Sequence, residues 1–182
     1  MPSIIGTNPP VARRSEFGAA IESTADTTAQ AIAGQIAFAV DSSQRWSVLR
    51  YYQAAATIAL GATLQKSLDT RDSNRLETAS LDIGGGNACK GISAAAVSNT
   101  GYYSWAYVAG YCPDAAMPST YASMQYMRLS ATYAGRLSSA NVNATVAHEA
   151  TWLTHVIAIS LGAHTVSTAN STNSCSLIGW FM

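Results

Sequence analysis

The residues with the strongest potential for chemistry are His148 and Glu149, a histidine followed by a carboxylate. Zinc proteases place two histidines four residues apart on one helix, with a glutamate directly after the first. Here the next histidine is His155, and a spacing of i to i+7 on a helix separates the two by about 10 Å. Zinc sits about 2 Å from each nitrogen ligand. This pair therefore does not predict a metal site, and we expect surface or strand histidines.

The other reactive groups also fall outside known catalytic patterns. The glycine run 84–86 lacks both the spacing and the lysine of a phosphate-binding loop. Ser104 is not flanked by the glycines of the Gly-x-Ser-x-Gly turn that exposes a hydrolase nucleophile. Asp69 and Asp72 could serve glycoside chemistry only inside a cleft, and in their charged surroundings we interpret them as solvated. We therefore expect a protein that is not an enzyme and that uses no metal or cofactor.

The three cysteines, Cys89, Cys112 and Cys175, form no recognisable framework. Their number is odd and no two lie close in sequence, so neither a disulfide scaffold nor a Cys-x-x-Cys metal clip is indicated. We expect buried free thiols. The first residues lack the basic region and long apolar run of a secretory signal, so we expect a chain made in the cytosol.

Charge is scarce in this chain. Ten basic and ten acidic residues cancel, and charged residues make up 11% of the sequence, against roughly 25% in soluble proteins. Such a chain has little attraction for nucleic acid or an anionic membrane. Its longest apolar run, Val156–Ala163, falls short of the roughly 20 residues that cross a bilayer. Because low charge protects poorly against self-association, we expect permanent assembly with other protein, and neither nucleic acid nor membrane as a partner.

The segments that would position these residues are short and separated by turn residues. Residues 1–40 are expected to form an extended arm with a possible short helix between Glu16 and Val40, where apolar residues recur near helical spacing. The charged segment Asp69–Thr78 is expected to be a solvated loop. Strands without helices between them predict an all-β domain over residues 41–182, a compact β-barrel or sandwich of short antiparallel strands. The expected strands are 45–53, 62–65, 91–97, 101–110, 126–132, 152–161 and 175–182.

The most distinctive of these strands runs from Gly101 to Gly110 and is rich in tyrosine and tryptophan. Aromatic residues fit a half-buried sheet, and glycines mark places where the chain turns or is approached closely, so we expect the strand to end at Gly110, before a loop containing Pro113. This cluster could stack on sugars or form a protein interface, and the scarcity of basic residues favours the interface. The candidate core or interface residues are Trp46, Tyr52, Tyr103, Trp105, Tyr107 and Trp180.

Residues 41–182 resemble a family of small virion proteins that decorate or cement the capsids of tailed bacteriophages. That family has an Asp-x-x-x-Arg-aromatic strand before an alanine-rich hairpin, and a later Gly-x-Tyr-Gly-Trp-Val strand that ends in glycine. At Ser104 this chain has serine where the family favours glycine. The matching residues are Asp41, Arg45, Trp46, Tyr51, Tyr52 and Ala54–Gly61, then Gly101, Tyr103, Trp105 and Gly110, then Ala131–Leu137, His148 and Ile157–Ile159.

The resemblance implies a structural protein of the virion. Its partner would be the major capsid protein, whose subunits it would staple together on the outer face of the capsid. The resemblance also implies a homotrimer that is assembled in the host cytoplasm. Two alternatives stay open: a carbohydrate-binding or adhesin module that uses the aromatic cluster around Trp105, and a minor capsid or tail protein of a phage particle.

Overall fold

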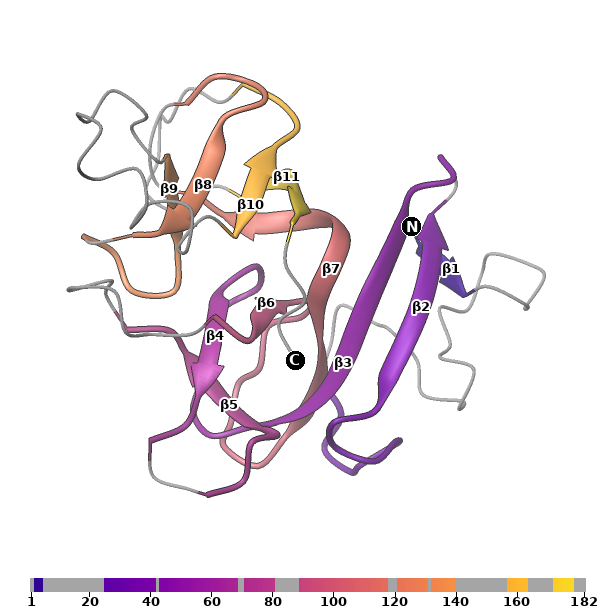
Figure 1. The fold of residues 1–182 in the computed structure, drawn as a ribbon. Coiled ribbons are helices and arrows are strands. Elements are labelled where there is room, and N and C mark those ends of the chain that lie inside the picture. Colours follow the sequence, from indigo (N-terminus) through magenta and orange to yellow (C-terminus); the bar gives the residue numbers. More distant parts are fainter. Residues whose placement is uncertain are drawn as a thin grey trace.

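The computed structural model describes residues 2–4, 25–41, 43–68, 71–80, 89–117, 121–130, 132–139, 157–163 and 172–178. Eleven strands form one continuous sheet (Figure 1), and the described residues include no helix. The all-β prediction is confirmed. The strands are β1 (Pro2–Ile4), β2 (Ile36–Asp41), β3 (Trp46–Ala54), β4 (Thr63–Lys66), β5 (Arg75–Thr78), β6 (Gly91–Ser93), β7 (Tyr103–Ala116), β8 (Tyr126–Leu129), β9 (Leu137–Ser139), β10 (Ala158–Ser160) and β11 (Thr172–Leu177).

Five of the strands close into a barrel. Neighbours in the series β3-β5-β4-β6-β7 are hydrogen bonded, and a further pairing of β3 with β7 joins the two ends of the series. The pairs in this ring are antiparallel except β3 with β5, which run parallel. The sequence predicted either a barrel or a sandwich of antiparallel strands, so the closed barrel is one of the two expected forms, whereas the parallel pair was not expected.

Strand β5 corrects the expectation that the charged segment 69–78 is a loop throughout. Its residue Leu76 is fully buried, whereas Arg75, Glu77 and Thr78 are partly exposed. Successive side chains of a strand point to opposite faces, so one apolar residue among charged neighbours is sufficient to complete the barrel wall. The many charged residues of this segment therefore indicated a loop, although the alternation of buried and exposed side chains around Leu76 is that of a strand.

The barrel interior combines apolar packing with a short chain of hydroxyl groups. Tyr52 from β3 packs there in one cluster with Leu64, Leu76 and Ala106 from three other strands. The Ser93 hydroxyl donates to the carbonyl oxygen of Ala95 at 2.8 Å, so the Tyr52 hydroxyl, 2.8 Å from the same Ser93 oxygen, is the donor between these two. Burial raises the pKa of Tyr52 to about 12. Tyr52 is therefore a core residue that remains protonated.

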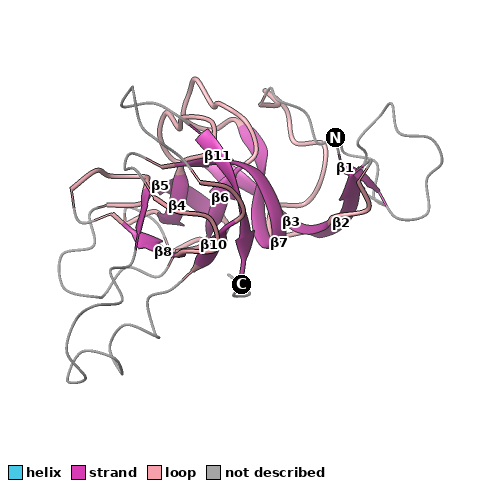
Figure 2. Ribbon diagram, turned by 90° about the horizontal axis from the view of Figure 1, so that it is seen from above, coloured by secondary structure: helices cyan, strands magenta, loops and turns pink. Residues whose placement is uncertain are grey.

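Two extensions of the sheet flank the barrel. Strands β1 and β2 continue it beyond β3, and β11, β10, β8 and β9 continue it beyond β7. Viewed from above, β1 and β2 lie on one side of the molecule and β4, β5 and β8 on the other (Figure 2). The largest apolar core joins the outward face of the barrel strands, including Tyr51 and Trp105, to buried residues of the β8–β11 extension such as Met127 and Leu177.

Strand β2 corrects the expected helix between residues 16 and 40. Over residues 25–40 the structure contains no helical residue, and residues 16–24 lie outside the described residues. Ala37 and Ala39 are fully buried while Phe38 between them is exposed, which is the period of a strand. The expected domain boundary between residues 40 and 41 falls inside β2, and of the expected arm, residues 2–4 pair with β2 as strand β1.

Strand β7 corrects the expectation that the aromatic strand ends at Gly110. It continues to Ala116, pairing with β3 up to Gly110 and with β11 from Gly110 onward. Gly110 has a φ of 76°, which bends the strand at the point where it changes partner. Pro113 lies beyond the bend, close to a register irregularity in β11, where a residue without an N–H is tolerated in a sheet.

A substitution at Gly110 tests this bend. A Cβ atom there would lie 2.5 Å from the Trp46 carbonyl oxygen and 3.0 Å from its ring, in addition to the positive φ. A positive φ alone costs a non-glycine residue about 1–2 kcal/mol, so we expect Gly110→Ala to lower the free energy of unfolding by more than this, measured by urea denaturation.

Two glycines provide matched controls for this experiment. Gly101 has a φ of 86° but no atom within 4 Å of a built Cβ, and Gly162 has neither a positive φ nor a close neighbour. Gly101→Ala should show only the conformational cost of about 1–2 kcal/mol, and Gly162→Ala should leave stability almost unchanged. Equal losses at Gly110 and Gly101 would contradict the close contact with Trp46.

Candidate interaction surface

The β2–β3 ribbon presents large apolar side chains to solvent. Trp46 is 54% exposed and Phe38 is 41% exposed. In the strand register Phe38 is opposite Val48 and Val40 is opposite Trp46, and residues directly opposite each other share a face of the sheet. We call the exposed side chains on this face, together with half-buried Ile36 and Val40, the Trp46 face. Val48 lies on the same face but is buried, packed with Val108 and Ala109 of β7.

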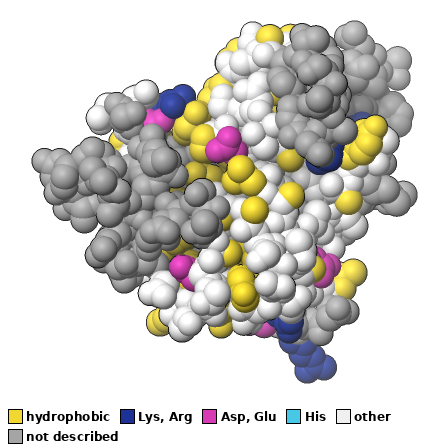
Figure 3. Space-filling model, turned by 180° about the vertical axis from the view of Figure 1, so that it is seen from behind, with side chains coloured by type: hydrophobic (Ala, Val, Ile, Leu, Met, Phe, Trp, Pro, Cys, Tyr) yellow, Lys and Arg dark blue, Asp and Glu magenta, His cyan; other side chains and the backbone are white. Residues whose placement is uncertain are grey.

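The two faces of the ribbon differ sharply in burial. On the opposite face, Ala37, Ala39 and Leu49 are fully buried in the main core. The position of the Trp46 face is therefore fixed by that core. On the side of the molecule seen in Figure 3, hydrophobic side chains gather near the middle of the described surface and charged side chains are few.

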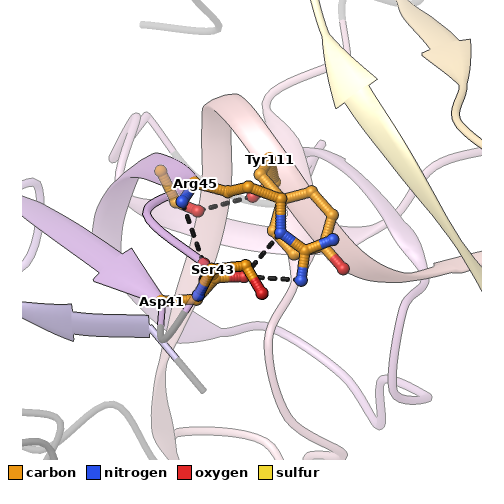
Figure 4. Close-up of polar contacts among 5 residues, drawn as sticks. Asp41, Ser43, Arg45 and Tyr111 are labelled. Carbon is orange, nitrogen blue, oxygen red and sulfur yellow. Dashed lines mark hydrogen bonds and ion pairs between the residues drawn. The ribbon is translucent and has the colours of Figure 1, made fainter.

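A network of hydrogen bonds around Asp41 shapes the turn between β2 and β3 (Figure 4). One carboxylate oxygen of Asp41 accepts from the backbone amides of Ser43 at 2.8 Å and Arg45 at 2.9 Å. The other accepts from the Arg45 side chain, at 2.7 Å from Nε and 2.6 Å from Nη2. Gln44 has a left-handed φ of 61°. The residues Asp41-x-x-x-Arg45 thus form a closed turn, in which both the backbone amide and the side chain of Arg45 are bound to Asp41.

The same arginine attaches the turn to strand β7. The Arg45 guanidinium carbon lies 3.7 Å above the centre of the Tyr111 ring, within the range of a cation–π contact. Beside it, the Ser47 hydroxyl donates to the Tyr111 carbonyl oxygen at 2.6 Å. Trp46 lies between these two attached residues and against Gly110, so its backbone is fixed while its side chain stays half exposed.

Opposing effects act on the Asp41 carboxyl. Its burial would raise the pKa, but the Arg45 amide, the Arg45 guanidinium and the Ser43 amide all donate to the carboxylate, and the charge of Arg45 adds to them. Together they hold the pKa of Asp41 below its usual value of 3.8. The turn therefore stabilises the charged form of the Asp41 carboxyl.

The structure separates the candidate aromatic residues of the sequence into core and surface. Tyr52, Trp105 and Tyr107 are buried, Tyr103 is half-buried, and Trp46 is exposed; Trp180 lies outside the described residues. The ring of Tyr51 stacks on Tyr103, with centroids 5.9 Å apart, and meets Trp105 at 5.0 Å. With 2% of its surface exposed, Trp105 is packed inside the protein and is not available to stack on a sugar ring.

Sequence reasoning missed one member of the Trp46 face, Phe38, and one residue that holds the neighbouring turn, Tyr111. Phe38 was hidden by the helical interpretation of its segment, although the alternation from Ile36 to Val40 was a signal for a strand with one exposed apolar face. Tyr111 was read only as part of the aromatic cluster, because the sequence does not show that β7 bends at Gly110 and brings its ring under Arg45.

Reactive groups do not assemble in the part of the chain that the structure describes. Within it, no three His, Cys, Asp or Glu side chains are placed to share a metal ion. His148, Glu149 and His155 lie outside the described residues. Cys89, Cys112 and Cys175 are buried free thiols, as expected. A helix long and apolar enough to cross a membrane is not found among the described residues.

No family model and no curated protein matches this chain. The function of the chain must therefore be inferred from the barrel, the Asp41 turn and the Trp46 face.

The low pKa of Asp41 predicts a specific pH dependence. A carboxyl group whose pKa is depressed by folding contributes stability above its unfolded pKa, and this contribution is lost as the pH falls through the folded value. We expect Asp41→Asn to be less stable than the native chain at pH 6, and the difference to shrink as the pH falls below about 4. Urea unfolding from pH 2 to pH 6 measures this.

The matched control is Ser43→Ala, which keeps both the carboxylate and the backbone amide that donates to it. Its difference from the native chain should not change across the same pH range. A difference between Asp41→Asn and the native chain that is equally large at pH 2 and pH 6 would mean that the charge of Asp41 does not stabilise the turn.

Proposed function

We propose that this chain is a non-enzymatic structural protein of a tailed-bacteriophage particle, which binds the outer face of the capsid and cements contacts between major capsid subunits. The observation that carries the proposal is the arrangement of Asp41, Arg45 and Trp46 at the start of β3. These are residues of the Asp-x-x-x-Arg-aromatic pattern that resembles capsid decoration proteins, and in this chain they form a fixed turn with an exposed tryptophan.

The chemistry of the Trp46 face favours a protein surface as its partner. Tryptophan and arginine are enriched among the residues that dominate binding energies at protein interfaces. Trp46 is exposed, and the side chain of Arg45 beside it is 47% exposed. With a net charge of zero, the chain offers no general attraction for nucleic acid, so contact area rather than charge would provide the affinity.

A fixed turn also suits a cementing role. Association costs free energy for every side chain and loop that must be ordered, and a surface that is rigid before binding avoids much of that cost. On an icosahedral shell many copies would act together, so that modest single contacts add up through multivalency. A homotrimer would provide three such surfaces at a site of local threefold symmetry.

Substitution of Trp46 tests the proposed surface. We expect Trp46→Ala to weaken binding to capsids assembled without this protein by about 30-fold, the effect of losing an interface residue worth about 2 kcal/mol. Co-sedimentation with the capsids measures the affinity. The matched control is Leu68→Ala, because Leu68 is 85% exposed but follows β4, away from the β2–β3 ribbon, and it should bind like the native chain.

Copy number distinguishes the proposed role from others on the particle. Quantitative mass spectrometry of purified virions should find hundreds of copies, and particles lacking the protein should lose resistance to heat. A handful of copies would instead indicate a minor capsid or tail protein. Native binding by Trp46→Ala would rule out the Trp46 face as the contact, whatever the copy number.

A further inference from the structure

Two of the three cysteines lie directly opposite each other on neighbouring strands. Cys112 of β7 and Cys175 of β11 are register partners in an antiparallel pair. In such pairs the Cα atoms are about 4.5–5.5 Å apart and both side chains point to the same face. Disulfide bonds span Cα separations of about 4.4–6.8 Å. The backbone geometry of this pair therefore fits a disulfide without movement of the strands.

The side chains of this pair also meet. The Cys112 and Cys175 thiols are hydrogen bonded to each other, and both residues are fully buried in the main apolar core. The third thiol is engaged elsewhere, since the Cys89 Sγ donates to the Gly91 carbonyl oxygen at 3.5 Å. Cys89 is still close enough to Cys175 to influence it electrostatically, which makes it the one competing partner in the described core.

We propose that Cys112 and Cys175 are a redox modification site, which forms a disulfide bond across β7 and β11 when the chain meets a small-molecule disulfide such as glutathione disulfide. One cysteine, as its thiolate, attacks a sulfur of the oxidant and releases one glutathione thiolate, leaving a mixed disulfide. The second cysteine, after losing its proton, displaces the second glutathione. The two protein thiols are oxidised and the glutathione disulfide is reduced to two glutathione molecules.

Burial determines when this reaction can take place. Thiolates are the reactive species, and burial raises the pKa of Cys112 well above its usual value, so the reduced folded protein should react slowly. The bond would form during folding or through transient opening of β11. Once formed, it would be shielded from reductants and would close the chain from residue 112 to residue 175, which includes β8, β9 and β10.

Refolding in a glutathione redox buffer tests the proposal. The full chain is unfolded, reduced, and refolded with glutathione disulfide, and its peptides are mapped by mass spectrometry without reduction. We expect a Cys112–Cys175 cross-link with Cys89 free, and a rise in Tm of about 5–15 °C over the reduced protein. The control Cys89→Ala should give the same cross-link and the same rise, and Cys175→Ala should give neither.

Two outcomes would overturn the proposal: a folded protein with three free thiols after this treatment, or a bond between Cys89 and Cys175. If Cys175→Ala does not fold, the peptide map of the native sequence still decides. Alkylation of the reduced, folded protein gives a second readout, in which Cys112 and Cys175 should label far more slowly than they do in urea.

Discussion

The bend of β7 at Gly110 is the constraint on which the rest of the structure depends. On one side of this residue β7 pairs with β3 and β6 and closes the barrel, and on the other it pairs with β11 and begins the second extension. The bend requires a positive φ and leaves no room for a side chain, because the Trp46 backbone and ring occupy that space. Gly110 therefore determines how the barrel, the β8–β11 extension and the exposed Trp46 are placed relative to one another.

The barrel also explains how a serine is accommodated at position 104. Ser104 is 3% exposed and lies opposite Tyr52 in the register of β3 and β7. Its hydroxyl forms a hydrogen bond with the Tyr52 hydroxyl. Since Tyr52 donates to Ser93, Ser104 is the donor to Tyr52, and the buried hydroxyl groups of Ser104, Tyr52 and Ser93 all have partners. A buried hydroxyl without a partner would cost about 1–3 kcal/mol, so the serine depends on the tyrosine opposite it.

Much of the fold could be predicted from local sequence, because strands and turns leave local signals. Alternating apolar residues indicated β3, aromatic content indicated much of β7, and Gly101 marked the turn before it. The errors arose where tertiary pairing overrides local pattern. Leu76 becomes a barrel residue only when β5 pairs with β3 and β4, and the helical spacing before Val40 gives way to pairing between β2 and β3. The alternation from Ile36 to Val40 indicates a strand, but no local signal reports which strands will pair.

The candidate surface was harder to predict, because residue type does not distinguish core from surface aromatic residues. Trp46 and Trp105 are both tryptophans and lie on paired strands, yet Trp46 is 54% exposed and Trp105 is 2% exposed. The difference comes from position: Trp105 faces the main core, whereas Trp46 begins β3 next to the Asp41 turn. A tryptophan at the end of a strand would normally be free to move with its turn. Here Asp41, Arg45 and Tyr111 fix the turn to β7, so the exposed ring is held in place before any partner arrives, and the ordering cost of binding is reduced in advance.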